Sequence, residues 1–395
     1  MRIAGGQPPP EALGPGGGPV ARGPRFPALE GVRALAALSI IAYHVGELGQ
    51  TQGQLSTFGQ RLTLGVPVFF VVSAFVLYRP FVAHRADGRP LPAIGPFLLR
   101  RAVRILPLFW VTMTVVWVTS PLLSASTRTQ FFGGVPWWRY YLFTQVYTDR
   151  SSIWALGPAW SLNVEMGFYL VLPFWALAAA WLIRRKVPVH VELVCLGLVV
   201  LSATSYYNQY EAVGSYLTRT PWANAGYFSI GMVLAIVSVD LESTRPIFLS
   251  RAVRFVVPFA ATGIAVIIAV FLFKPVVRQF GELRLALVSL VLLPAAFDHR
   301  PVTMAKRILM QPHIQRVGVL SYGVYLFHRQ IALGLRLYLW APMDKYDYVV
   351  ALTAVIVLTV VLASASYRYL ELPLIRRAGK VGRPDRAVPA QPGPS

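Results

Sequence analysis

Long apolar segments dominate this sequence and limit the folds open to it. Of 395 residues, 55% are hydrophobic and 13% are charged, a balance outside the usual range for soluble domains. A helix needs about 20 apolar residues to cross a bilayer, and about ten such segments follow one another. They cover residues 29–48, 62–83, 97–122, 160–183, 191–207, 221–239, 252–273, 283–297, 317–339 and 348–370. The sequence predicts an all-α polytopic membrane bundle of about ten transmembrane helices.

The basic residues between these segments predict the orientation of the bundle. Lys and Arg number 37 against 16 Asp and Glu, which gives a net charge of +21. Most of the basic residues fall at the two termini and in alternate loops, and basic loops resist translocation. Ten spans with both termini in the cytoplasm fit this distribution. The charge then reflects topology and attraction to anionic lipid of the bilayer, so no nucleic-acid partner is predicted.

Composition divides the chain into three regions. Residues 1–25 and 378–395 are rich in Pro and Gly, so we expect two disordered tails around a transmembrane domain at 26–377. No apolar stretch directly follows the first basic residue, so the first span is expected to act as its own insertion signal. Cys195 is the only cysteine, which excludes an intramolecular disulfide and a thiolate metal site, and no metal is predicted.

Arg33 and His44 place two ionisable groups within the first apolar segment. Such groups are costly in a membrane unless they have a partner or line a wet cavity, so they indicate a functional site. His44 follows Arg33 by eleven positions. On an α-helix that spacing returns to within about 20° of the same face and spans roughly 16 Å along the axis. One helix face is thus predicted to carry a cation near one surface and an imidazole deep in the membrane.

Six sequence patterns occur in one order along the chain. They read FPALEGVRALAALSIIAYH, GVPVFFVVSAF, RRAVRILPLFW, PAWSLNVEMGFYLVLPF, LSYGVYLFH and YRYLELPLIRR. This order resembles the acyltransferase-3 family of membrane O-acyltransferases, which modify sugars, polysaccharides, peptidoglycan and macrolides in bacteria. The resemblance covers residues 26–377 and implies ten transmembrane helices in a bacterial inner membrane. Three motifs depart from the family pattern, because Glu30 stands where aspartate is usual, Ala74 stands where glycine is usual, and Leu372 interrupts the last motif.

The resemblance also implies a donor site. Its arginine-to-histidine spacing falls on Arg33 and His44, and its RxxR motif falls on Arg101 and Arg104. It implies acyl-CoA, most simply acetyl-CoA, as a donor substrate on the cytoplasmic side, without a permanently bound cofactor. Guanidinium groups suit the phosphates of coenzyme A, so these arginines are expected to bind the donor. The alternative is that these arginines bind no donor and act only as basic residues that keep their loops in the cytoplasm.

His44 and Glu165 are the predicted catalytic pair. Residue counts from the two helix ends place each group about 8 Å below the outer surface. At one level, the carboxylate would fix the tautomer of the imidazole, and His44 would act as general base on the acceptor hydroxyl. A structural ion pair of Glu165 with Arg329 or Arg368 is an open alternative, as is a two-step route through an acylated histidine.

Four further residues are predicted to contact substrate, namely His328, Ser73, Tyr325 and Trp160. For His328 and Ser73 a packing role is an equal or better alternative. The predicted function is transfer of a short acyl group from acyl-CoA to a hydroxyl of a carbohydrate, glycolipid or macrolide-type acceptor. A transporter or lipid-linked sugar translocator with a His/Glu proton relay is the main alternative, disfavoured because no internal repeat is visible. An inactive scaffold is disfavoured by the intact set of predicted catalytic residues.

Overall fold

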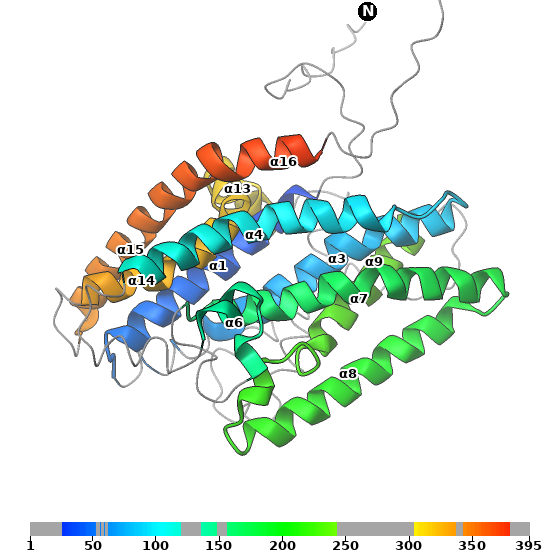
Figure 1. Cartoon of the computed structure of the whole chain (residues 1–395), viewed down its shortest axis with the longest axis horizontal. Helices are drawn as coiled ribbons and strands as arrows, with labels where there is room; N and C mark the ends of the chain where they lie inside the picture. Colours follow the sequence, from blue (N-terminus) through cyan, green and yellow to red (C-terminus); the bar gives the residue numbers. More distant parts are fainter. Residues whose placement is uncertain are drawn as a thin grey trace, which may run out of the picture.

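The computed structural model of the chain describes residues 26–52, 56, 59, 62–119, 136–147, 156–242, 304–336 and 343–379. This part of the chain is a bundle of helices (Figure 1), which confirms the all-α class for the described residues. In order, its elements are α1 (Pro27–Leu48), η1 (Leu62–Leu64), α3 (Gly65–Ala86), α4 (Ile94–Thr119), α6 (Trp137–Tyr141), η3 (Gln145–Tyr147), α7 (Ala159–Arg184), α8 (Val189–Glu211), η4 (Tyr216–Arg219), α9 (Ala225–Glu242), α12 (Met304–Leu309), α13 (Pro312–Val319), α14 (Ser321–Arg336), α15 (Lys345–Ser366), η6 (Tyr367–Glu371) and α16 (Leu372–Ala378).

Seven helical segments within the described ranges are long and apolar enough to cross a membrane. They are Pro27–Leu48, Leu62–Ala86, Ile94–Thr119, Ala159–Arg184, Val189–Glu211, Ala225–Glu242 and Lys345–Ala378. These segments correspond to the first six predicted spans and the tenth. The predicted spans 252–273 and 283–297 lie outside the described residues, as do the tail 1–25 and residues 380–395 of the other tail. The total of ten and the side of each terminus therefore stay predictions.

The ninth predicted span, 317–339, differs from the structure. α13 ends at Val319, and α14 starts at Ser321 and has 16 residues. The described part of α14 is about 24 Å long at 1.5 Å per residue, and residues 337–339 of the predicted span lie outside the described residues. The helices break here because α13 packs against the start of α1, where Gly318 lies so close to the backbone of Glu30 that a Cβ would not fit. Hydropathy continues across this break and does not reveal it.

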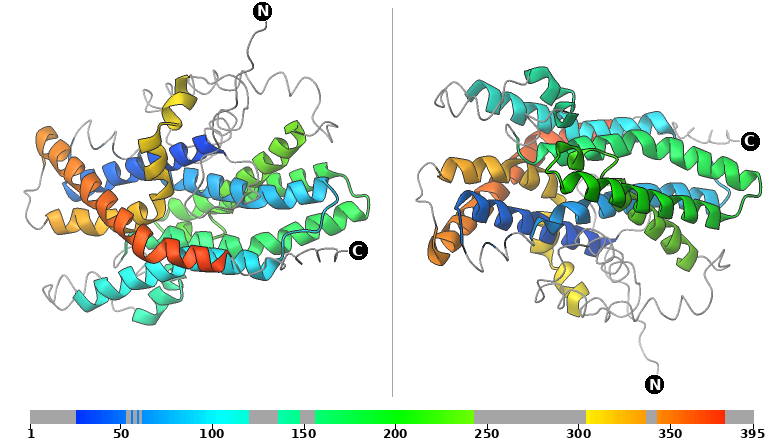
Figure 2. Two further views of the ribbon diagram at one scale, coloured as in Figure 1. Left: turned by 90° about the horizontal axis from the view of Figure 1, so that it is seen from above. Right: turned by 90° about the horizontal axis from the view of Figure 1, so that it is seen from below.

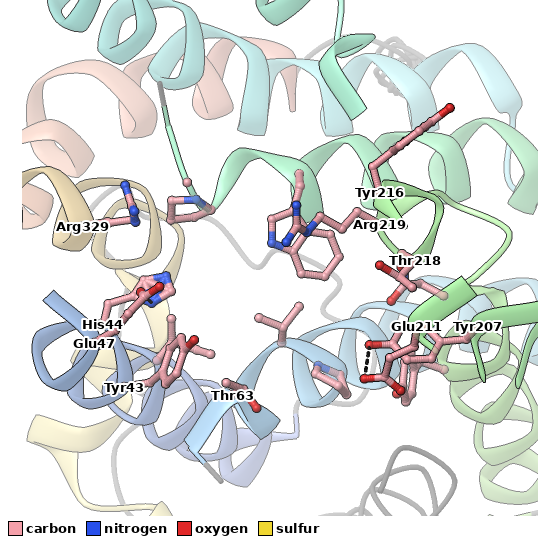
Figure 3. A pocket seen from close by; sticks show the side chains of 18 of the residues that line it. Tyr43, His44, Glu47, Thr63, Tyr207, Glu211, Tyr216, Thr218, Arg219 and Arg329 are labelled. Carbon is pink, nitrogen blue, oxygen red and sulfur yellow. Dashed lines mark hydrogen bonds and ion pairs between the residues drawn. The ribbon is translucent and has the colours of Figure 1, made fainter. Parts of the chain in front are cut away.

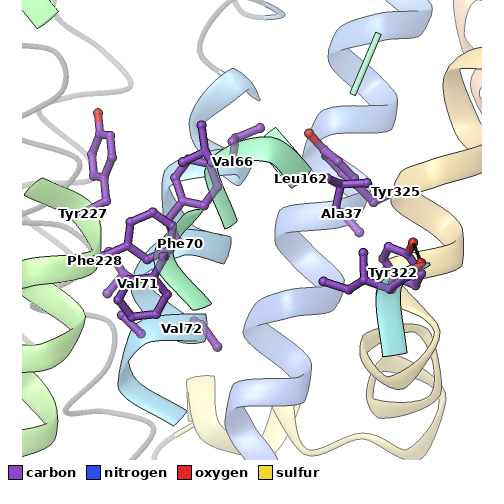
Figure 4. Packing of buried hydrophobic residues seen from close by; sticks show 14 of the residues in the cluster. Ala37, Val66, Phe70, Val71, Val72, Leu162, Tyr227, Phe228, Tyr322 and Tyr325 are labelled. Carbon is purple, nitrogen blue, oxygen red and sulfur yellow. Dashed lines mark hydrogen bonds between the residues drawn. The ribbon is translucent and has the colours of Figure 1, made fainter. Parts of the chain in front are cut away.

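α1 lies inside the bundle, with α14 and α15 on one side of it and α3, α7, α8 and α9 on the other (Figure 2). Small residues permit the close crossings, as expected for helices packed in a membrane. Gly231 of α9 lies against the backbone of Val71 in α3, and Gly65 of α3 lies against the backbone of Ala36 in α1. The region where α3, α7 and α9 meet is aromatic (Figure 4), with the ring of Phe228 4.9 Å from that of Phe70.

Two ion pairs, of which the second is buried on both sides, join α3 to its neighbours. Arg79 forms an ion pair with Glu242 of α9 and donates a 3.0 Å hydrogen bond from Nε to Ser238. Arg85 lies 2.9 Å from the carboxylate of Glu192 in α8, and both side chains are at most 10% exposed. Because removal of one partner would strand a buried charge, these pairs hold the order of α8, α3 and α9 at this end of the bundle.

Candidate active site

A cavity of about 950 Å³ opens between the last turns of α1 and α8, the first turns of α3, α7 and α9, and one face of α14. We call it the polar cavity because hydroxyl and charged groups line much of it (Figure 3). Its titratable lining residues are Tyr43, His44, Glu47, Tyr207, Glu211, Tyr216, Arg219, Tyr227, Tyr325 and Arg329. The volume is within the usual range of about 300–1,000 Å³ for small-molecule sites.

His44 lies on the wall of the polar cavity, near the end of α1. Its Nδ1 atom is buried without a hydrogen-bond partner among the described residues and lies 3.8 Å from Oε2 of Glu47. Its ring centroid is 5.1 Å from that of His328. An imidazole that borders a polar cavity and has an uncommitted nitrogen has the arrangement that a general base needs.

His328 lies behind His44 and is completely buried. Its Nδ1 is 2.6 Å from the carbonyl oxygen of Tyr325. Because a carbonyl only accepts, Nδ1 must carry a proton and donate it, which leaves Nε2 as the bare nitrogen. Nε2 is buried and has no hydrogen-bond partner among the residues the structure describes. His328 does not line the polar cavity, so its predicted substrate contact has no support from the lining.

Tyr325 and Trp160 do line the polar cavity, as their predicted role requires. The Tyr325 hydroxyl is 2.7 Å from Oγ of Ser161 and also donates to the carbonyl oxygen of Pro158 at 3.3 Å. These bonds tie α14 to the first turn of α7. The Trp160 ring packs edge-on against Phe70 of α3, with centroids 6.3 Å apart. Both side chains are therefore fixed at the place where α3, α7 and α14 meet.

Glu165 lies in a different environment from His44. Ser73 of α3 donates a 2.7 Å hydrogen bond to its Oε1, and the Tyr169 hydroxyl donates to the same oxygen. Five residues along α7 from Trp160 turn the helix by about 140° and advance it by about 7.5 Å, so Glu165 points away from the polar cavity. Among the described contacts, no hydrogen bond or ion pair joins Glu165 to His44.

The pairing expected between Glu165 and His44 is thus not seen, because depth alone does not fix the direction in which a helix residue points. The alternative ion pairs of Glu165 with Arg329 or Arg368 are also not seen in the described part of the chain. Ser73 acts here as a hydrogen-bond donor to a carboxylate, which neither of its two predicted roles included. A catalytic role for Glu165 stays a prediction.

The three arginines predicted to bind the donor come together around Glu165 and Tyr169. Arg33 is an electrostatic neighbour of Arg104, Glu165 and Tyr169, and Arg101 shares the same three neighbours. We call these three basic residues the arginine cluster. Arg33 also pairs with Glu30 at 3.5 Å, whereas Nε of Arg101 is buried with no hydrogen-bond partner among the described residues. Converging guanidinium groups repel one another, and a bound phosphate relieves that repulsion.

Sequence reasoning missed four charged residues of the polar cavity, namely Glu47, Glu211, Arg219 and Arg329. Glu47 follows His44 by three residues, and this spacing places both on one helix face, so the signal was present. Arg329 directly follows His328 and was considered only as a partner of Glu165. Arg219 belongs to the short turn η4 before α9, and no local pattern links it to α1.

Sequence comparison agrees with the fold and with the order of the motifs. The acyltransferase-3 family, described as an acyltransferase domain, matches residues 26–368. A relative from Staphylococcus aureus (strain COL), provisionally named an O-acetyltransferase, is 25% identical over 368 residues, covering 88% of this chain and 57% of the relative. The O-acetyltransferase OatA of Staphylococcus aureus (strain NCTC 8325) is 24% identical over 385 residues, covering 90% of this chain and 58% of the relative.

The chain therefore spans little more than half the length of these curated relatives. No solved structure matches it. The family match covers most of the chain, including all the site residues named above, and confirms the resemblance read from the six motifs. The chain belongs to the acyltransferase-3 family.

Proposed function

We propose that the protein is an integral-membrane O-acyltransferase that moves a short acyl group, most simply acetyl, from acyl-CoA to a hydroxyl group. The observation that carries this proposal is the position of His44. Its ring borders the polar cavity, while Arg33, on the same helix, belongs to the arginine cluster. His44 follows Arg33 by eleven positions, a rise of roughly 16 Å along the helix. One helix thus links a site suited to phosphate with a site suited to a hydroxyl-bearing acceptor.

In the proposed reaction, His44 removes the proton of the acceptor hydroxyl as its oxygen attacks the thioester carbonyl. The tetrahedral intermediate then collapses, the carbon–sulfur bond breaks, and the proton held by His44 goes to the departing thiolate. The products are the acyl ester and free coenzyme A. The phosphates of the donor are bound by Arg33, Arg101 and Arg104. Hydrogen bonds from a guanidinium to a phosphate are charge-assisted and therefore stronger than hydrogen bonds between neutral groups.

The lining of the polar cavity supports a carbohydrate-like acceptor. Tyrosine hydroxyls, two carboxylates and two guanidinium groups supply hydrogen bonds, and the Trp160 and Tyr227 rings supply flat apolar surfaces. Such a mixture fits a ring compound with many hydroxyl groups. The two relatives reported above carry O-acetyltransferase names, which agrees with a hydroxyl acceptor and an acetyl group.

The test is release of free coenzyme A from acetyl-CoA by the purified full-length protein in lipid nanodiscs, with and without a panel of sugar acceptors. We expect release only when an acceptor is present. His44→Ala should lower the rate about 100-fold or more, because general bases contribute about 10²–10⁴-fold. His44 has no hydrogen bond to lose among the described residues and borders an open cavity, so this variant should reach the membrane at a normal level.

His313→Ala is the matched control, because His313 is exposed at the start of α13. This control should keep wild-type activity. More than a tenth of the wild-type rate in the His44→Ala protein would contradict the general-base role. Movement of a labelled sugar carrier across the bilayer with no acylated product would favour the translocator alternative.

A further inference from the structure

Arg329 places a guanidinium group in the polar cavity, where it forms no ion pair with any described residue. It lines the cavity beside His44 and Glu47 (Figure 3). Glu47 is an electrostatic neighbour of Arg329, yet among the described residues Arg329 forms neither an ion pair nor a hydrogen bond. A partly buried cation without a partner is costly, and proteins keep such groups where a ligand supplies the opposite charge.

The backbone of the segment before α7 holds this guanidinium in place. Gly157 lies directly against the side chain of Arg329, and a Cβ atom at position 157 would be 2.6 Å from Nε. Glycine is therefore required for the observed position of Arg329. Any larger residue would push the guanidinium away, and the far end of an arginine can move without disturbing the helices.

A second guanidinium faces the same part of the cavity. Arg219 of η4 also lines the polar cavity, and Arg219 and Arg329 share Tyr43 and Glu47 as electrostatic neighbours. Glu211 lies on the opposite wall, where it accepts a 3.4 Å hydrogen bond from Tyr207. Of the two guanidinium groups, Arg329 is the one that lies beside His44 and forms no ion pair with a described residue.

We propose that Arg329, assisted by Arg219, binds an anionic group of the acceptor, so that the acceptor is an acidic sugar derivative bearing a carboxylate or a phosphate. The planar fork of a guanidinium matches both groups in two-point contacts. Binding there places the rest of the sugar beside His44. This inference rests on the proposed role of the polar cavity as the acceptor site.

The experiment measures binding and transfer separately on the purified full-length protein in nanodiscs. The probes are matched sugars: methyl glucoside against methyl glucuronide, and glucose against glucose 6-phosphate. In the wild type we expect the acidic member of at least one pair to bind about tenfold more tightly than its neutral partner, the effect of one charge-assisted hydrogen bond. The pair that shows the preference identifies carboxylate or phosphate as the recognised group.

Three variants locate the preference. Arg329→Ala should abolish it, and Arg329→Lys should restore only part of it, because an ammonium lacks the fork. Gly157→Ala should reduce it while keeping the charge, since it displaces the guanidinium. Arg316→Ala, at an exposed position of α13, is the control and should keep the wild-type preference.

The proposal is overturned if no acidic probe binds in an Arg329-dependent way, or if Arg329→Ala keeps the wild-type preference. Arg329-dependent binding of an acidic probe without release of coenzyme A from acetyl-CoA would leave the anion site standing and count against the proposed function. The binding and transfer readouts therefore separate failure of this inference from failure of the acyltransferase proposal.

Discussion

Glu165 should be energetically coupled to Ser73 and not to His44. Ser73 donates a 2.7 Å hydrogen bond to the Glu165 carboxylate in a partly buried site. A hydrogen bond to a charged group contributes about 1.5–3 kcal/mol to stability. A double-mutant cycle of Ser73→Ala and Glu165→Ala should therefore give a coupling free energy of at least about 1.5 kcal/mol.

The matched cycle pairs His44→Ala with Glu165→Ala. No hydrogen bond or ion pair among the described residues joins these two side chains, and His44 shares no described hydrogen-bond partner with Glu165. Independent sites add to within about 0.5 kcal/mol. The free energy of unfolding, measured by equilibrium denaturation in mixed micelles, supplies all the values and does not depend on enzymatic activity.

Equal coupling in the two cycles would refute this reading of the site. A value above about 1 kcal/mol for His44 with Glu165 would show that the two groups interact, as residues in contact do. The catalytic pair expected from the sequence would then be restored. A small value in both cycles would mean that the Ser73 hydrogen bond contributes little to the folded state.

Two further predictions concern the buried cations. Arg101→Ala or Arg104→Ala should raise the KM for acetyl-CoA about tenfold by removing a charge-assisted contact to phosphate. Replacement by Lys should recover only part of the loss, because an ammonium lacks the planar fork. Unchanged KM values would mean that both arginines only keep their loops in the cytoplasm. Arg85→Ala should lower the free energy of unfolding by about 3–5 kcal/mol, because the buried Glu192 carboxylate loses its counter-charge and keeps only hydrogen bonds from Tyr78 and Trp175. Asp87→Ala, at an exposed ion pair, should cost less than about 1 kcal/mol. Similar losses in the last two variants would show that the Arg85 pair is not effectively buried.

Hydropathy and helix geometry were enough to predict most of the described fold. Apolar length alone located α1, α4, α7 and α8 to within a few residues, because a bilayer leaves a hydrophobic segment few options besides a helix. The break between α13 and α14 was missed because its cause is tertiary. Gly318 meets the backbone of α1 there, and no local feature of composition records that contact.

The candidate site was predictable in its parts but not in their grouping. The arginine cluster was expected, since the basic residues that form it sit near one end of their helices and carry family motifs. Glu165 lies on α7 as expected, but its described hydrogen bonds come from Ser73 and Tyr169 and not from His44, because the rotation of α7 about its axis depends on packing against α3. Arg219 and Arg329 reach the polar cavity from elements 110 residues apart, which no local pattern reveals.

The face of α1 between the arginine cluster and the polar cavity bears on how the two sites work together. Ala37 and Ile40 follow Arg33 by four and seven residues, so they lie on the face that also carries His44. Both are buried and apolar. The polar cavity reaches Ile40 but none of the three arginines, so a proposed donor held at Arg33 could bring its thioester to His44 only if the side chains packed on this face move apart. The helical periodicity of α1 thus places Arg33, Ala37, Ile40 and His44 on one line, and the packing over Ala37 separates the arginine cluster from the polar cavity.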